Sequence, residues 1–424
     1  MQFTRLRVAV AAAIIAACAA PAAARADAVT DWNGYANAAI FATTPTAHAA
    51  VVKTAMVQAA VYDAVNAIAG GYQPYLPNTA PADSTFSQNA AAATAAFRVA
   101  SALAPSQVGT LQSRYDASLA AIPDGPAKTG GIAVGEAAAA ALVAARANDG
   151  RDGPFTFVLG TQPGEWRKSP PAFGLDPTPW VANVKPFLVP NAEMLRSDGP
   201  NPLTSAAYAE DFNEVKSLGS LTSTKRTADQ TMAAIFWQSQ PGGLYGQVMK
   251  QLSTLYGLTT AENARLYAMA SLAAADGAIG CWNDKYYWNF WRPIDAIHDA
   301  ANDGNPATEA DADWKPLFDP STPTTPPLST PSFPDHPSGH SCVSSGTLHA
   351  IQEFFRTDKL AFDITSTRFP TQPRHYDRGS EALKEVLDAR VWGGIHFRTA
   401  DVQGAVIGKK VAHWERKHYF QPVN

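Results

Sequence analysis

The chain has 424 residues, of which 46% are hydrophobic and 17% charged, and its formal net charge at pH 7 is −4. This length and apolar content allow a large core, in one big domain or in two closely packed ones. The pI of about 6.1 gives no basic footprint for nucleic acid, which excludes that class of partner. Any anion site must therefore be a local concentration of positive charge.

The first residues have the composition of an export signal. Residues 1–7 are short and basic, residues 8–17 are apolar, and Ala24-Arg25-Ala26 and Ala26-Asp27-Ala28 both fit a small-x-small cleavage site. The apolar run is too short to span a bilayer, and no later stretch reaches 18 uncharged apolar residues. We therefore predict a signal peptide over residues 1–26 and an exported, periplasmic or secreted protein without a membrane span.

The three cysteines leave two questions open. Ile15-Ala16-Ala17-Cys18 is similar to the lipid-attachment box of bacterial lipoproteins, so lipidation of Cys18 is an alternative to its loss with the signal peptide. In an oxidising compartment Cys281 and Cys342 either form a disulfide or remain buried thiols. The sequence gives no distance between them and does not decide.

Most of the mature chain has helical periodicity, and strand-like alternation is rare. Nine segments rich in Ala, Leu and Met repeat their apolar residues about every 3.6 positions, and many carry few charges, as expected inside a bundle. We predict an all-α fold with helices over Met56–Ile68, Ala90–Ala104, Gly131–Ala147, Ala206–Leu218, Ala228–Trp237, Ala261–Gly280, Ser338–Phe355, Ser380–Val391 and Ala400–Lys417.

Two long segments interrupt this pattern. Residues 153–196 contain several Pro and Trp residues without periodicity, and residues 305–337 contain nine prolines, which excludes a helix. Loops this long are usually functional or disordered, and the second leads directly into Ser338, so we predict that it forms a wall of an active site. A possible division near residue 200 separates an N-terminal helical part, 27–200, from a catalytic core, 201–424.

The first stretch with chemical interest is Lys285-Tyr-Tyr-Trp-Asn-Phe-Trp-Arg292-Pro293. Seven residues are close to two helical turns, so Lys285 and Arg292 are predicted on one face of a helix that Pro293 ends or bends. A solvated basic pair on an aromatic packing helix has the same pattern. The apolar setting favours a bound partner instead, because buried cations need one.

The second stretch is Pro337-Ser338-Gly339-His340, followed by an apolar helical face. Ser338 is a good N-cap, Gly339 allows close approach of the backbone, and the first amides of such a helix favour an anion. His340 in the first turn is placed to give or take a proton. Ordinary capping beside an exposed histidine is the alternative reading.

The third stretch is Arg390-Val-Trp-Gly-Gly-Ile-His396. Gly393 and Gly394 are predicted to break a helix just after Arg390, whose guanidinium offers a bidentate fork to an oxyanion. His396 offers an imidazole nitrogen, although alone it has the pattern of a satisfied structural histidine. Together the three stretches predict a site for a compact, highly charged oxyanion such as phosphate or vanadate.

In order and spacing, these stretches resemble the signature of the vanadium haloperoxidases and the type 2 phosphatidic-acid-phosphatase-like enzymes. Flanking residues are similar to the haloperoxidases, in particular to their bacterial exported branch. Trp282 and Phe333 stand where chloroperoxidase-type sites carry Trp and Phe, and Met56–Ile68 resembles a helix of bacterial haloperoxidase-like proteins. The resemblance implies two packed four-helix bundles with long Pro-rich loops.

The resemblance also implies roles for these residues. Lys285, Arg292, Ser338, Gly339 and Arg390 would hold vanadate, and His396 would bind its metal. His340 would accept a proton from hydrogen peroxide, Lys285 would polarise the peroxide, and Trp282 and Phe333 would shape the halide pocket. The implied activity is oxidation of halide to hypohalous acid, with a small organic molecule as a further candidate substrate.

Some residues depart from the family pattern. Ala389 replaces a Ser of the phosphatase pattern, and Asp401 lies five residues after His396 instead of four, so the acceptor that orients His396 is left undefined. His336 is either a second imidazole of the site or, as we favour, a solvated loop residue.

Two other activities fit the same residues. An exported acid phosphatase would use His396 as nucleophile, through a phospho-histidine, and His340 as the acid. A phosphate-binding protein would bind without turnover.

Overall fold

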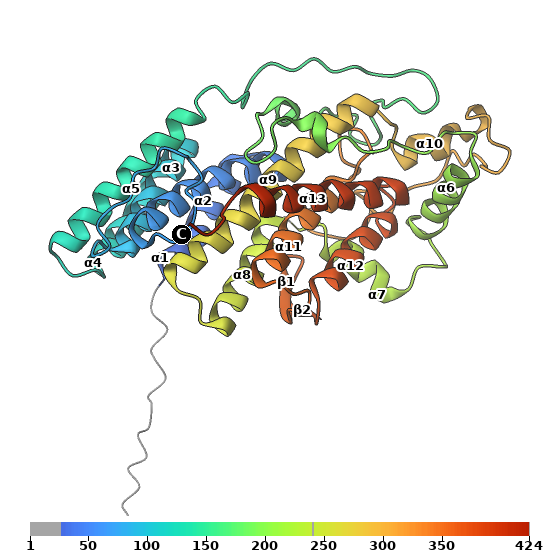
Figure 1. The fold of residues 1–424 in the computed structure, drawn as a ribbon. Coiled ribbons are helices and arrows are strands. Elements are labelled where there is room, and N and C mark those ends of the chain that lie inside the picture. Colours follow the sequence, from blue (N-terminus) through green and yellow to red (C-terminus); the bar gives the residue numbers. More distant parts are fainter. Residues whose placement is uncertain (1–26, 240, 424) are drawn as a thin grey trace, which may run out of the picture.

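The computed structural model describes residues 27–239 and 241–423, and the predicted signal peptide and Cys18 lie outside them. The prediction of an all-α helical-bundle fold is confirmed (Figure 1). Each of the nine predicted helices corresponds to a helix of the structure. Four further helices, α1, α4, α8 and α10, and a small two-stranded sheet were not predicted from the sequence.

The N-terminal group of helices packs around Ala-rich surfaces. Small side chains let helices approach closely, and α3 buries an almost unbroken run of alanines against α2 and α5. Ser87 caps α3 by accepting a hydrogen bond from the Ala90 amide. The helices of this group are α1 (Ala28–Thr43), α2 (Ala47–Ala69), α3 (Gln88–Leu103), α4 (Val108–Ala120) and α5 (Pro126–Ala145), with a 3-10 turn at Pro105–Gln107.

The C-terminal group contains the predicted catalytic stretches. Its central pair is α11 against α13, and both pack on α9. The helices are α6 (Ala206–Leu218), α7 (Ala228–Phe236), α8 (Pro241–Tyr256), α9 (Thr260–Trp288), α10 (Pro293–Asp299), α11 (Gly339–Phe355), α12 (Gly379–Trp392) and α13 (Arg398–His418), with a 3-10 turn at Ala300–Asn302. The strands β1 (Phe362–Ser366) and β2 (Phe369–Tyr376) form an antiparallel hairpin with Phe362 opposite Tyr376.

Helix α9 joins the two groups, and Figure 1 shows it between the blue α2 and the red α13. It begins with a capping box, in which Thr259 and Glu262 satisfy each other's backbone amides. Most of its 29 residues are buried, and one hydrophobic core runs from Val29 to Phe420 around it. The predicted division near residue 200 remains a prediction.

The prediction that Lys285 and Arg292 share one helix is wrong. Helix α9 ends at Trp288 because Asn289 adopts a left-handed conformation, with φ +49°. Pro293 then begins α10 instead of ending a helix, since its fixed φ suits a first helical position, and Arg292 becomes the N-cap. The two cations therefore converge from separate elements.

The two irregular segments lie along the C-terminal group. Residues 146–205 contain only short 3-10 turns, Pro179–Asn183 and Ala192–Leu195, both packed against α9. Three backbone amides of this segment, those of Phe187, Leu188 and Val189, donate to the buried carboxylate of Asp276 in α9.

Among the described residues, α5 alone is long and apolar enough by composition to cross a membrane.

Candidate active site

A cavity of about 340 Å³ lies where the three predicted stretches meet. Six of the nine predicted site residues line it, and Lys285, Arg292 and Ser338 are fully buried behind its wall. Helices α2, α9, α11 and α12 and the proline-rich segment before α11 all contribute to it. The lining residues are Pro45, Thr46, Ala47, His48, Val51, Gln238, Trp282, Ser329, Pro331, Phe333, Gly339, His340, Val343, Arg390 and His396.

Lys285 holds the end of the proline-rich segment. Its ammonium group donates to the carbonyl oxygens of Pro334, at 2.9 Å, of Asp335, at 3.0 Å, and of Pro337. Burial lowers the pKa of Lys285 to about 8. Because three carbonyls already accept its three donors, Lys285 must exchange one of these bonds before it can donate to a bound oxyanion.

The two arginines keep donors free. Arg292 donates from Nε to the Phe333 carbonyl, at 2.8 Å, and from Nη1 to the Ile395 carbonyl, at 2.7 Å, whereas its Nη2 has no partner. Arg390 donates from Nη1 to the Trp237 carbonyl, at 3.3 Å, and its Nε has no partner. Burial lowers the pKa of each to about 10, so both remain charged at neutral pH.

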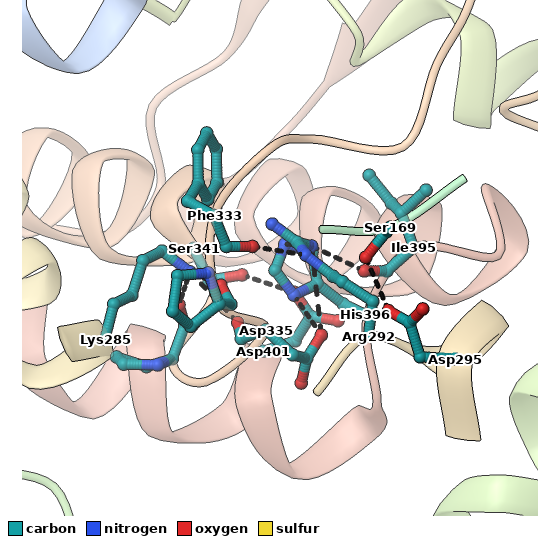
Figure 2. Close-up of polar contacts among 12 residues, drawn as sticks. Ser169, Lys285, Arg292, Asp295, Phe333, Asp335, Ser341, Ile395, His396 and Asp401 are labelled. Atoms are coloured by element: carbon teal, nitrogen blue, oxygen red, sulfur yellow. Dashed lines mark hydrogen bonds and ion pairs between the residues drawn. The ribbon is translucent and has the colours of Figure 1, made fainter. Parts of the chain in front are cut away.

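Asp335 supplies the carboxylate that the sequence left undefined. Its Oδ1 lies 2.8 Å from Nδ1 of His396, within ion-pair distance although not aligned as a linear hydrogen bond (Figure 2). The other ring nitrogen, Nε2, lies 3.3 Å from Nη1 of Arg292. Burial and the charges of Arg292 and Lys285 hold the pKa of His396 well below its ordinary value. His396 is therefore a neutral imidazole that Asp335 can orient.

Asp401 faces a different group, and Figure 2 shows both carboxylates. Its Oδ1 accepts a hydrogen bond from the Ser341 hydroxyl at 2.8 Å. Burial raises the pKa of Asp401 to about 7, although the hydroxyls of Ser338 and Ser341 oppose the shift. Asp401 thus joins α13 to the start of α11, whereas the ion pair with His396 is made by Asp335.

The start of α11 faces the cavity. Ser338 is its N-cap residue, as predicted, but its side chain makes no capping hydrogen bond. A Cβ on Gly339 would lie 2.8 Å from the Trp282 ring, so only glycine allows this backbone and this indole to approach so closely. Burial and the charge of Arg390 hold the pKa of His340 well below its ordinary value, and its Nε2 has no partner. His340 is thus a neutral acceptor beside Arg390.

Trp282 and Phe333 form the aromatic side of the cavity, with ring centroids 5.0 Å apart. His48, from the first turn of α2, stacks on Trp282 at 3.8 Å and completes this side. His48 was not predicted from the sequence, because no local motif marks it. Asp176, whose carboxylate accepts from the Trp282 indole at 2.7 Å, was not predicted either.

The expectation that His336 is a solvated loop residue is wrong. Its side chain is 1% exposed, and its Nε2 lies 2.9 Å from the Ser197 hydroxyl. Burial and the charge of Lys285 lower the pKa of His336 to about 3. It does not line the cavity and instead links the proline-rich segment to the irregular segment after α5.

Cys281 and Cys342 are both buried and free in the structure.

The donor set fits a compact oxyanion. Lys285, Arg292 and Arg390 are three buried cations, and they outnumber the two buried carboxyls, Asp335 and Asp401, that lie among them. Burial raises the pKa of Asp335 well above its ordinary value, against the pull of Arg292 and Lys285. The unpaired Arg292 Nη2 and Arg390 Nε offer hydrogen bonds that an anion would accept. Vanadate and phosphate share this shape and charge.

Comparison with known proteins agrees with this arrangement. Residues 265–424 match the family model described as the VCPO second helical-bundle domain. The vanadium chloroperoxidase of Curvularia inaequalis is 25% identical over an alignment of 230 residues, which covers 42% of this chain. The match spans 37% of that relative's length.

Solved structures extend the likeness to the whole fold. A bacterial vanadium-dependent iodoperoxidase superposes with a TM-score of 0.77 at 22% identity, over 94% of this chain and 97% of that one. A holo-type bacterial vanadium-dependent chloroperoxidase superposes with a TM-score of 0.65 at 17% identity, over 92% of each chain. The resemblance to the vanadium haloperoxidase superfamily is therefore confirmed, in sequence over residues 265–424 and in fold over nearly the whole chain.

Proposed function

We propose that this protein is an exported, soluble, vanadate-dependent haloperoxidase, which uses hydrogen peroxide to oxidise halide to hypohalous acid. The observation that carries the proposal is a neutral His396, contacted by Asp335 and surrounded by three buried cations at the edge of a cavity with an aromatic side. The relatives named as haloperoxidases support vanadate over phosphate as the natural occupant. Bound vanadate would supply a Lewis-acidic centre for the activation of hydrogen peroxide.

The residues around the cavity would bind the oxyanion through charged and through neutral hydrogen-bond donors. Arg292 and Arg390 would offset the charge of the bound oxyanion through donors that have no partner in the protein. Lys285 would add a third charge, after it releases one of its three carbonyl acceptors. Ser338 and the Gly339 amide, at the start of α11, would add neutral donors.

The two histidines have separate roles. Nε2 of His396 would bind the metal of vanadate, while Asp335 holds the ring from Nδ1. His340 lines the cavity with a free Nε2, and its lowered pKa keeps it neutral. It would therefore accept a proton from hydrogen peroxide at that atom. Trp282 and Phe333 would form the halide side of the cavity.

The deciding experiment compares two activities of the mature protein after removal of bound oxyanions. We expect halogenation of a phenol dye by hydrogen peroxide and halide to rise with added vanadate and saturate, and hydrolysis of p-nitrophenyl phosphate to stay low. Phosphate should compete with vanadate, because both fit the same donors. Hydrolysis without vanadate-dependent halogenation would instead establish an acid phosphatase.

A further inference from the structure

The cavity is lined by a third histidine, His48, which lies apart from the residues that would hold the oxyanion. His48 lines it from the start of α2, with its ring stacked on Trp282 at a centroid distance of 3.8 Å and an interplanar angle of 20°. It meets Phe333 edge-on at 5.7 Å. The side chain is 5% exposed, so its small open surface faces a space already shared with His340 and Arg390.

A buried carboxylate fixes one nitrogen of this ring. Nε2 of His48 lies 3.2 Å from Oδ1 of Asp176 and 2.8 Å from the Thr178 hydroxyl. Asp176 also accepts from the Trp282 indole at 2.7 Å, from the Thr178 amide at 2.9 Å and from the Tyr286 hydroxyl at 3.2 Å. Since a carboxylate only accepts, the proton of neutral His48 belongs on Nε2, and Nδ1 keeps its lone pair.

The charge state of the pair follows from its surroundings. Burial lowers the pKa of His48, as does Lys285, whereas Asp176 raises it, and the net shift is downward. Burial would raise the pKa of Asp176, but hydrogen bonds from His48 and Trp282 hold it below its ordinary value. The resting pair is thus an aspartate carboxylate and a neutral imidazole, an arrangement suited to accept a proton at Nδ1.

We propose that His48 is a catalytic base for a phenolic substrate, with Asp176 as its positioning residue. The inference rests on the proposed haloperoxidase function, which supplies the hypohalous acid. A cavity of about 340 Å³ has room for a small aromatic molecule, and Trp282 and Phe333 offer it aromatic surface. The lone pair of Nδ1 is complementary to an O–H group and not to a halide ion.

The chemistry balances with hypohalous acid as the only oxidant. The phenol O–H bond breaks, its proton moves to His48 Nδ1, and the electron pair stays on oxygen. A ring carbon ortho or para to that oxygen attacks the halogen, so a carbon–halogen bond forms and the halogen–oxygen bond breaks. The leaving hydroxide takes the proton from His48 to become water. Loss of the ring C–H proton with reprotonation of oxygen restores the phenol, and carbon is oxidised as halogen is reduced.

The test separates halide oxidation from halogenation inside the cavity. Halide oxidation is measured without an organic acceptor, as triiodide formation from iodide and hydrogen peroxide. Selectivity is measured as the halogenation rate of a phenol divided by that of its methyl ether, and the same ratio for hypohalous acid added to buffer is the reference. The variants are His48→Phe, which keeps a ring against Trp282, and His48→Gln, which keeps a hydrogen-bond acceptor without a base. Ser329→Ala is the matched control, since Ser329 lines the same cavity from an exposed position.

We expect the wild-type ratio to exceed the buffer ratio by about 10²-fold, in the range of general-base catalysis. His48→Phe should bring it down to the buffer value, and Ser329→Ala should keep the wild-type ratio. Because the ratio compares two acceptors of the same oxidant, a change in the rate of halide oxidation does not alter it. His48→Gln should lower kcat for the phenol more than it raises KM. A wild-type ratio equal to that in buffer, or a His48→Phe ratio equal to wild type, would overturn the role of His48 and leave the proposed function intact. Absence of vanadate-dependent triiodide formation in the wild type would overturn both.

Discussion

The two sides of the cavity are built on different principles. The cationic side consists of residues from three sequence motifs, and its charges are held by backbone carbonyls, three of them on Lys285. The aromatic side joins Trp282 to His48 and Asp176, which come from parts of the chain without a recognisable motif. We infer that the cationic side determines which oxyanion is bound. The aromatic side would determine which substrate reacts there.

The largest expected effect belongs to the cationic side. His396→Ala removes the imidazole that we propose binds the metal of vanadate, so both vanadate retention and halide oxidation should fall to background. The measurements are vanadium content after gel filtration and the rate of triiodide formation. The control is His413→Ala, an exposed histidine of α13, which should behave as wild type. Retained activity in His396→Ala would show that the site is assigned wrongly.

The next effect concerns the contact between α9, which carries Trp282 and Lys285, and the irregular segment, which carries Asp176. Asp276 of α9 accepts the amides of residues 187–189, which follow Asp176 in the same irregular segment. Burial raises the pKa of Asp276 to about 6, above its value of 3.8 in a model peptide. A raised acid pKa means that the folded state binds the proton more tightly. Asp276 therefore stabilises the fold fully below pH about 4, and this contribution is lost as pH rises through 6.

The measurement is the free energy of urea unfolding of wild type and Asp276→Asn between pH 4 and 7. The wild type should lose up to about 3 kcal/mol relative to the variant over this interval, from a shift of about two pKa units. Asp276→Asn will have a constant offset, because an amide satisfies fewer backbone donors. A difference between the two proteins that does not change with pH would contradict the prediction.

A third prediction separates the two carboxyls near His396. Asp335→Asn replaces the carboxyl group whose oxygen lies 2.8 Å from His396 Nδ1 and should weaken vanadate binding by about 10- to 100-fold, as loss of an orienting partner does. Asp401→Asn, the matched control, changes a carboxyl that bonds to Ser341 and should have a smaller effect. The measurement is vanadate titration of the stripped protein. Equal losses of vanadate affinity in both variants would contradict the role of Asp335 as the residue that orients His396.

The difference between these carboxyls also shows what the sequence could predict. Helical periodicity predicted nine helices, because apolar spacing reflects burial on one face. The cationic residues were found because they occur in short motifs. Asp335 was noticed beside Pro337 but not assigned, since its contact with His396 depends on how the proline-rich segment folds back. His48 and Trp282 stack across two helices far apart in sequence, and no local pattern encodes such a contact. The misplaced helix at Arg292 came from reading Pro293 as an end when it is a beginning.

The smallest expected effect tests how firmly the aromatic side is held. Asp176 has several donors, and Tyr286 supplies one of the longest of them, at 3.2 Å. Tyr286→Phe removes that hydroxyl and keeps the ring against Phe155, so the protein should lose about 1 kcal/mol of unfolding free energy. Because Trp282 and Thr178 still hold Asp176, the ratio of phenol to methyl-ether halogenation should stay near wild type. A ratio that fell as far as in His48→Phe would mean that the orientation of Asp176 depends on the Tyr286 hydroxyl, and that Trp282 and Thr178 alone do not hold it.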